Sequence, residues 1–503
     1  MTLEKPACFA IALCSLLAVV MPAAARAADP CLVPWPKTVT IGDGSMSVTP
    51  TTRIVTAAPS LAPLAKILAG EIHAVTGVQV TTADGAGGPG DIVLALDETL
   101  KGERYRFTVA NPATVSGGTY GAVALGTVTL LQSLVTKDGT ASLPRLTVAD
   151  EPAAGFRGLM IDVARQYHSI ENLEQIVRLC RLYKVRYLQL HLTDDQSFMF
   201  PSRAFPLLTT QNHNGGKAYT IEQLKGLVAY ADARGVTIIP EYEVPGHSGA
   251  AIRTMRDLFV IAKTKPYEHH ASINFCKDEV MRAVDTIVGE ICEVFTSSPY
   301  FHIGGDEADL ALADQNADFK AAMAKHDLPN QHELYRRFVC QMNDIVKKRG
   351  KQMIVWEGFG KNGKVAIPKD IIVMNYEVRF YMPDQLAADG YQVINTSWTP
   401  LYVVNATTRP PEEIYAWNVR QFKPHGAKPD DKGVIVPSAE NILGAQMCAW
   451  EQPESAEIPS LRNRLPAMME RIWSPEAGRT FDDFARRQAV TDKLLDRLLQ
   501  AGK

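Results

Sequence analysis

The sequence predicts an α/β protein in which a (β/α)8 TIM barrel forms the catalytic domain and a small α+β domain precedes it. Two observations favour this fold class. Near residue 150, short alternating runs rich in Thr, Val, Ala and Gly give way to a repeated order of strand, loop and helix. The second region holds eight near-continuously apolar strands, which is typical of a closed parallel sheet buried on both faces. An open, doubly wound sheet is the alternative architecture.

Residues 1–28 are predicted to be a signal peptide. Lys5 precedes an apolar core at residues 8–21, and small residues suited to cleavage near Ala27 or Ala28 follow it. The core is shorter than the ~20 apolar residues of a membrane span, so an uncleaved anchor is less favoured. We therefore expect an exported protein, periplasmic or secreted, whose mature chain has no membrane span.

Residues 29–150 are predicted to form the small α+β N-terminal domain. Alternating runs at residues 38–50, 91–98 and 105–118 indicate strands, and residues 60–77 indicate one helix between them.

Residues 151–503 are predicted to form the barrel and a C-terminal helix. Helical periodicity with an apolar face occurs at residues 171–184, 221–235, 278–295 and 332–350. The eight strands are expected at residues 158–164, 185–193, 236–244, 300–306, 352–357, 371–377, 392–397 and 442–450.

The charge balance does not imply a polyanionic partner. The chain has 52 basic and 55 acidic side chains and a net charge of -3, without a long run of like charge. We expect no nucleic-acid partner and a small or neutral ligand.

Side chains typical of a sugar site follow the predicted strands. Such barrels carry their chemistry at the carboxyl ends of the strands, and aromatic faces with hydrogen-bonding acids suit a pyranose ring. The candidates at these ends are Arg165, Asp194, Asp195, Glu243, His247, Asp306, Glu307, Trp356, Glu357, Tyr376, Trp398, Tyr402, Trp450, Glu451 and Gln452.

Two adjacent acids, Asp306 and Glu307, follow a buried strand and two glycines in "YFHIGGDEA". Many glycosidases use two carboxylates separated across the scissile bond, but neighbours in sequence suit substrate-assisted hydrolysis, in which the 2-acetamido oxygen of the sugar attacks the anomeric carbon. One acid would then hold the acetamide N–H and the other would protonate the glycosidic oxygen. A nearby carboxylate would raise the pKa of that general acid towards its working range.

The motif "HIGGDE" resembles the signature of the glycoside hydrolase family 20 β-N-acetylhexosaminidases. "IDVARQY", "LHLTDDQSF", "VPGHS", "IVWEGF" and "GAQMCAW" also resemble motifs of that family, in its order, and residues 29–150 resemble its small α+β domain. The resemblance implies a retaining exo-β-N-acetylhexosaminidase that hydrolyses terminal, non-reducing β-linked GlcNAc or GalNAc through an oxazolinium intermediate. The implied partner is an oligosaccharide or glycoconjugate with a terminal N-acetylhexosamine. No cofactor and no metal are implied, and a homodimer stays an open possibility.

The resemblance also implies roles for individual residues. Glu307 would be the general acid and later the base. Asp306 would orient the acetamido group, and Tyr402 would donate a hydrogen bond to its oxygen. The residues implied in substrate binding and its support are Arg165, Asp194, His247, Trp356, Tyr376, Trp450 and Gln452.

The chain departs from the family pattern at several of these positions. Tyr376 stands where the family usually has Trp, and Glu243 stands where Asp is common. Glu451 and Gln452 follow Trp450 where Trp-x-Glu is usual, and Asn405 is one residue late. The departures lie at positions expected to bind the sugar hydroxyls or to enclose the acetamido group. The sequence therefore predicts the reaction better than it predicts which sugar is preferred.

Three other functions remain open. A conventional two-carboxylate glycosidase would use Glu357 as its nucleophile. A metal-dependent amidohydrolase would draw on His191, His247 and His302, although the first strand lacks the His-x-His pair that such sites commonly need. A non-catalytic carbohydrate-binding barrel is the third.

Overall fold

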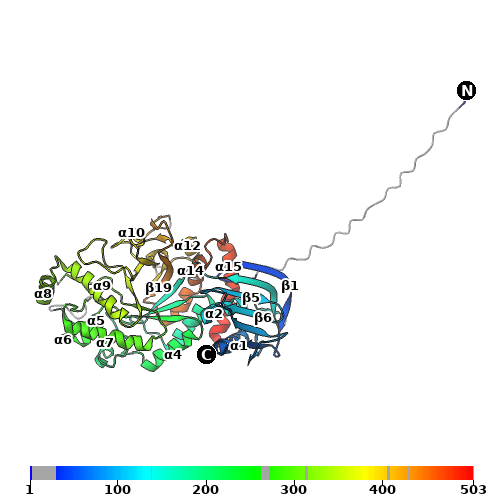
Figure 1. Ribbon diagram of the computed structural model, residues 1–503, viewed down its shortest axis with the longest axis horizontal. Helices are drawn as coiled ribbons and strands as arrows, with labels where there is room; N and C mark the ends of the chain where they lie inside the picture. The colour runs from blue at the N-terminus through cyan, green and yellow to red at the C-terminus, as the bar shows by residue number, and fades with distance from the viewer. Residues whose placement is uncertain are drawn as a thin grey trace.

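The protein is described by a computed structural model over residues 1–2, 30–137, 139–261, 271–311, 315–404, 408–428 and 430–501. Most of the predicted signal peptide, and Asn405, lie outside the described residues. Figure 1 shows two packed parts, a sheet at the N-terminal side and a larger α/β part beside it.

The larger part is a closed barrel of eight parallel strands, as predicted. They are β9 (Phe156–Asp162), β10 (Tyr187–His191), β11 (Thr237–Glu241), β12 (Tyr300–His302), β13 (Gln352–Trp356), β14 (Ile372–Asn375), β15 (Gln392–Asn395) and β19 (Ile442–Trp450). Each strand pairs with the next, and β19 pairs with both β15 and β9, which closes the sheet and excludes the open alternative. A short additional strand, β16 (Tyr402–Val404), also pairs with β19.

The barrel interior is packed with side chains, because its strands are buried on both faces. Polar groups inside it bond to one another. Gln446 donates to Gln189, Gln189 donates to Glu241, and the indole N–H of Trp356 donates to Glu241 at 2.8 Å. These four side chains are at most 1% exposed, so the barrel is solid below its carboxyl end.

Helices follow most barrel strands; the first four given below lie at the predicted places, and the last three were not predicted. They are α3 (Ile170–Leu182), α4 (Ile221–Asp232), α7 (Asp278–Val294), α9 (Gln331–Lys347), α10 (Pro383–Ala388), α13 (Glu454–Leu461) and α14 (Arg464–Trp473). Side-chain caps fix several starts: Ser169 accepts from Asn172 N–H, and Thr220 forms a capping box with Gln223.

The N-terminal part is an eight-stranded mixed sheet. Seven strands run in the order β1-β8-β5-β6-β4-β2-β3, and β7 pairs with β8. They are β1 (Thr38–Val48), β2 (Arg53–Thr56), β3 (Thr81–Asp84), β4 (Ile92–Leu96), β5 (Tyr105–Val109), β6 (Ala113–Gly117), β7 (Val135–Lys137) and β8 (Thr140–Asp150). The fold class is thus confirmed for both parts.

This part contains two α-helices, whereas the sequence predicted one. Helix α1 (Ala62–Thr76) is the predicted helix, and α2 (Tyr120–Ser133) was missed. Twelve residues of α2 are buried, so it has no polar face to produce a helical period. Figure 1 shows α2 and the C-terminal helix α15 (Phe481–Gln500) between the sheet and the barrel.

Buried polar bonds join the two parts. The Arg157 guanidinium makes two hydrogen bonds of 2.8 Å to the Glu103 carboxylate, and it lies over the Trp473 ring. Lys184 donates to the Tyr105 hydroxyl at 2.8 Å. The sheet therefore supports the barrel from the side away from the strand ends that form the site.

Among the described residues, none of the helices has both the length and the apolar character of a bilayer span. The six cysteines of this part of the chain are free thiols.

Candidate active site

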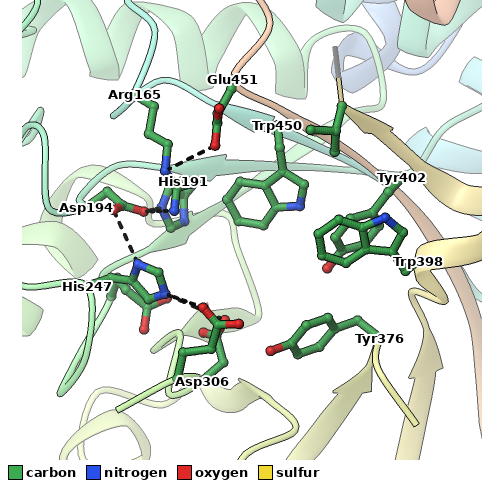
Figure 2. Close-up of a pocket in the computed structure, with 13 residues that line it drawn as sticks. Arg165, His191, Asp194, His247, Asp306, Tyr376, Trp398, Tyr402, Trp450 and Glu451 are labelled. Carbon is green, nitrogen blue, oxygen red and sulfur yellow. Dashed lines mark hydrogen bonds and ion pairs between the residues drawn. The ribbon is translucent and has the colours of Figure 1, made fainter. Parts of the chain in front are cut away.

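A cavity of about 280 Å³ opens at the carboxyl end of the barrel (Figure 2). Its walls come from the segments that follow seven of the eight strands, as expected for a barrel of this kind. The lining residues are Arg165, His191, Asp194, Glu243, His247, Asp306, Glu307, Tyr376, Trp398, Tyr402, Val404, Trp450 and Glu451.

The two adjacent acids are presented by a tight turn after β12. Gly304 and Gly305 have φ of 68° and 100°, and Glu307 has φ of 45°. A Cβ atom on Gly304 would lie 1.8 Å from a carboxylate oxygen of Glu243, so only glycine fits there. Glu243 also accepts the Gly305 N–H at 2.8 Å. The contacts of Glu243 with Gly304 and Gly305 thus hold the segment in which Glu307 adopts its strained backbone conformation. Such strain is common at functional sites.

The turn directs the two carboxylates differently. The side chain of Asp306 is 15% exposed and that of Glu307 is 43% exposed. Oxygen atoms of both lie within 4.8 Å of one another and of a ring nitrogen of His247. One acid therefore lies in the cavity wall and the other reaches the mouth.

His247 connects this pair to a buried carboxylate. Its Nε2 lies 3.4 Å from Glu307 and 4.0 Å from Asp306, and its Nδ1 lies 3.4 Å from Asp194. These carboxylates hold the pKa of His247 well above its usual value although burial opposes the rise. The ring is therefore a cation that neutralises part of the acidic cluster.

Asp194 is the centre of a second set of buried contacts. Its Oδ2 lies 2.7 Å from Arg165 Nη2 and 2.7 Å from His191 Nε2. The other ring nitrogen of His191 lies 2.7 Å from Glu241. Burial works against the charge of Asp194, but the Arg165 and His247 cations hold its pKa well below the usual range. Asp194 stays ionised and fixes the position of Arg165.

Burial raises the pKa of two acids beside the turn. For Asp306 the loss of water is the largest cause, and the negative charges of Glu307 and Glu241 add to it. For Glu243 the rise is larger, since burial is complete and Asp306 adds repulsion. Burial and the repulsion from Asp306 thus favour the protonated form of Glu243.

The cavity has a polar side and an aromatic side (Figure 2). Arg165, Asp194 and Glu451 form the polar side. On the other side the Tyr376 and Tyr402 rings are parallel within 5° with centroids 6.2 Å apart. Trp398 packs 4.4 Å from Tyr402, and Trp450 lies under the Arg165 guanidinium at 5.1 Å. Asp306 lies between the two sides.

The structure brings eight of the ten predicted site residues to this cavity, whereas Trp356 and Gln452 lie outside its lining. Trp356 does not line it, because its ring is buried in the barrel and its N–H is bound to Glu241. Gln452 is also buried, and its amide donates to the Trp450 carbonyl at 3.1 Å.

At the departure from the family's Trp-x-Glu pattern, the side chain that reaches the cavity is the carboxylate of Glu451 and not the amide of Gln452. Glu451 has φ of 57°, which turns its side chain into the cavity while Gln452 turns away. Its carboxylate lies 3.9 Å from Arg165 Nε and is about half exposed.

The Glu357 carboxylate is directed away from the cavity. It accepts backbone N–H groups from the five residues 376–380 at 2.6–3.3 Å, and the side-chain amide of Asn375 at 3.0 Å. A carboxylate surrounded by six donors is not available as a nucleophile, which contradicts the two-carboxylate alternative that used Glu357.

Several groups near the cavity have the ligand types of a metal site. One grouping is His191, Glu241 and Glu243, whose ligand atoms lie within 4.8 Å of one another. Both ring nitrogens of His191 are hydrogen-bonded to carboxylates, so that ring has no lone pair left for a metal. Its contacts instead fit a charge network, with the pKa of His191 raised to about 10 by Glu241 and Asp194.

Sequence reasoning gave Trp398 as a candidate but did not place His191 and Val404 among the binding residues. His191 lies in β10, and the period-two alternation that points it to the cavity was a usable signal. Val404 is the last residue of β16, a three-residue strand that is too short for the sequence to show a period.

The chain matches two family models. The model described as Glycosyl hydrolase family 20, catalytic domain, matches residues 155–476, and Glycosyl hydrolase family 20, domain 2, matches residues 29–151. Both matches follow the division of the structure into barrel and sheet.

Individual proteins are similar over most of the chain. A β-hexosaminidase of Porphyromonas gingivalis is 28% identical over 91% of this chain, which spans 62% of that protein. A β-N-acetylhexosaminidase of Cellulomonas fimi is 27% identical, with 93% of this chain and 95% of that protein covered. The crystal structure of a GH20 exo-β-N-acetylglucosaminidase from Vibrio harveyi, in complex with N-acetylglucosamine, has a TM-score of 0.81 at 24% identity and covers 93% of this chain and 77% of that one. This last likeness supports the fold.

Proposed function

Because the chain belongs to glycosyl hydrolase family 20, we propose that it is a retaining exo-β-N-acetylhexosaminidase that works by substrate-assisted catalysis. Its substrate would be an oligosaccharide or glycoconjugate with a terminal β-linked N-acetylhexosamine. The acetamido oxygen of that sugar would attack the anomeric carbon, and water would later open the resulting oxazolinium ring.

One observation carries the proposal. The Oδ1 atom of Asp306 is buried in the cavity wall and, within the part of the chain that the structure describes, has no hydrogen-bond partner. An unmade bond at a buried carboxylate is costly, so such an atom calls for a donor from a ligand. An acetamide N–H is a donor of the required kind, and the aromatic side of the cavity would receive the acyl methyl group.

Glu307 would serve as the acid and base of the reaction. It reaches the mouth, where a leaving group would lie, and the His247 cation is 3.4 Å away. As Glu307 gives up its proton to the glycosidic oxygen, that cation would stabilise the carboxylate that forms. The Asp306 carboxylate would stabilise the positive charge of the cyclic intermediate.

The polar side of the cavity would bind the sugar hydroxyls. Arg165 is held by Asp194 and Asp162, with N–O distances of 2.7 and 3.1 Å, and it is 14% exposed. Its fixed guanidinium and the Glu451 carboxylate together offer donors and acceptors to neighbouring hydroxyls. Trp450, beneath Arg165, would face the C–H side of the ring.

The experiment that tests this function compares aryl β-glycosides with and without an N-acetyl group. We expect cleavage of the GlcNAc or GalNAc glycoside and at least about a hundredfold lower kcat/KM for the plain glucoside, with no effect of EDTA. Glu307→Gln should lose about 10²- to 10⁴-fold on glycosides with poor leaving groups. Equal cleavage of the plain glucoside would refute the mechanism.

A variant of the second acid separates the two roles. Asp306→Asn keeps the volume but weakens the acceptor, so it should lower kcat/KM on acetamido sugars and weaken inhibition by a thiazoline mimic of the intermediate. Activated leaving groups should restore much of the Glu307→Gln rate and little of the Asp306→Asn rate. If activated leaving groups restored the Asp306→Asn rate and not the Glu307→Gln rate, Asp306 would be the general acid and Glu307 the residue that binds the acetamido group.

We also propose that the protein is exported, on the basis of the apolar core and small residues within residues 1–28. N-terminal sequencing of the protein recovered from periplasm or medium tests this. A mature chain that begins near Ala28 or Asp29 is expected.

A further inference from the structure

We propose that Tyr376 makes this site accept N-acyl groups that end in a hydroxyl, such as the N-glycolyl group, in preference to apolar acyl groups of the same size. The inference rests on the proposed function and concerns the acyl end of the same cavity. It assigns Tyr376 as a specificity-determining residue and Glu357 as the residue that positions it.

The acyl end is identified by the position of Asp306. If the amide N–H of the substrate is bound by Oδ1 of Asp306, the acyl carbon chain extends away from the polar side, towards Tyr376, Tyr402 and Trp450 (Figure 2). The end of the acyl group is therefore enclosed by aromatic rings. The two tyrosines add hydroxyl groups to this wall, and Trp450 adds a buried indole N–H.

The Tyr376 hydroxyl is turned into the cavity and is available to a ligand. The side chain is 5% exposed, and Figure 2 shows the hydroxyl directed towards the acids. Among the described residues it forms no hydrogen bond. Burial and the nearby negative charges of Asp306 and Glu307 hold its pKa well above the usual value, so the hydroxyl stays a donor. A ligand hydroxyl at this place would give it a partner.

The backbone that carries Tyr376 is fixed by an unusual arrangement. The N–H groups of residues 376–380 converge on the two oxygens of Glu357, which is 1% exposed. The turn forces Val378 to φ of 56°, a conformation that β-branched residues rarely adopt. Strain of this kind persists where the surroundings hold it and is concentrated near binding sites.

The packing around the ring fixes its direction as well. The Trp356 ring meets Tyr376 edge-on at 5.8 Å, and Tyr402 lies parallel to it at 6.2 Å. The hydroxyl thus has one position, as a group that discriminates between ligands requires. Loss of a single neutral hydrogen bond changes binding by roughly 2- to 13-fold.

The test uses three aryl glycosides of glucosamine that carry N-acetyl, N-glycolyl and N-propionyl groups. Glycolyl and propionyl are nearly equal in size but differ in the nucleophilicity of the acyl oxygen, so the contribution of the Tyr376 hydroxyl is the change in their kcat/KM ratio between wild type and Tyr376→Phe. We expect wild type to favour glycolyl over propionyl by about 3- to 10-fold. Tyr376→Phe should lower this ratio by about the same 3- to 10-fold factor, whatever it does to the rate on the N-acetyl glycoside.

Two further variants test the positioning and the specificity of the effect. Glu357→Gln keeps Tyr376 but replaces the carboxylate that accepts the N–H groups of residues 376–380. The glycolyl-to-propionyl ratio should therefore fall although the Tyr376 hydroxyl is present. Tyr391→Phe removes another buried tyrosine hydroxyl, one that donates to the Ile367 carbonyl outside the cavity, and should leave the ratio unchanged.

The outcomes separate this inference from the function on which it rests. Cleavage of the N-acetyl glycoside with a wild-type glycolyl-to-propionyl ratio near one would overturn the inference alone. So would an equal loss on all three substrates in Tyr376→Phe, because the hydroxyl would then serve the reaction itself. A protein that cleaves none of the three would overturn both.

Discussion

At the residue scale, the turn after β12 depends on the absence of one side chain. Gly304 lies against the Glu243 carboxylate and has φ of 68°, so an alanine there meets both a clash and an unfavourable backbone. We predict that Gly304→Ala displaces Asp306 and Glu307 and lowers kcat/KM at least about tenfold, with a loss of stability of about 1–3 kcal/mol. The double variant Gly304→Ala/Glu243→Ala should recover part of the stability. If urea unfolding shows that the stability losses of Gly304→Ala and Glu243→Ala simply add in the double variant, the clash with Glu243 is not the cause of the destabilisation.

His191 makes stability depend on pH. Its pKa is about 10 in the folded protein, against an ordinary value of 6.5, because two carboxylates flank it. A raised pKa stabilises the fold in full below about pH 6.5, and that contribution is lost as the pH rises towards 10. We predict that the difference in unfolding free energy between wild type and His191→Gln shrinks over this interval. A constant difference would contradict a charged His191.

The residue scale is also where sequence reasoning was least complete. A position at the end of a barrel strand predicts nearness to the site, and this was correct for Arg165 and Tyr402. It does not predict which way a side chain turns beyond the last strand residue. Glu451 reaches the cavity, and Gln452 does not, because of a left-handed backbone that no sequence pattern announces.

At the element scale, the two helices of the N-terminal part respond oppositely to the same change. A Cβ on Gly126 in α2 would lie 2.5 Å from Val115 Cγ1, whereas one on Gly70 in α1 would have nothing within 4 Å. We predict that Gly126→Ala destabilises by about 1–3 kcal/mol through overpacking. Gly70→Ala should stabilise by about 0.5–1 kcal/mol, because alanine favours the helix. Thermal unfolding of both variants tests this, and stabilisation by both would contradict the packing of α2.

The same two helices explain what the sequence could predict among the elements. Helix α1 keeps polar residues on one side and was found, while α2 is buried all round and was not. All eight barrel strands were found, since apolar runs between helices of clear period leave little ambiguity. Hydrophobic periodicity reveals a helix or strand only when one of its faces is exposed. A fully buried element can therefore be predicted only from the segments that flank it.

At the scale of the whole molecule, a buried ion pair holds the sheet to the barrel. Arg157 is 0% exposed, and its partner Glu103 is on the other part of the chain. We predict that Arg157→Met leaves Glu103 with only the longer contact to Arg186, at 3.7 Å, and lowers the unfolding free energy by about 3 kcal/mol. Lys347→Met, at the pair Lys347–Asp370 in which both side chains are about half exposed, should change stability little. Equal effects of the two variants in urea unfolding would contradict a special role for the buried pair.

The packed interior of the barrel makes the cavity a dead end. Gln189, Glu241, Trp356 and Gln446 fill the space below it, so a sugar chain could not thread through and would have to enter tip first. Each released sugar would then have to leave through the same opening before the shortened chain could enter again. Trimming one unit per visit would follow from this blind geometry, whatever the length of the glycan outside.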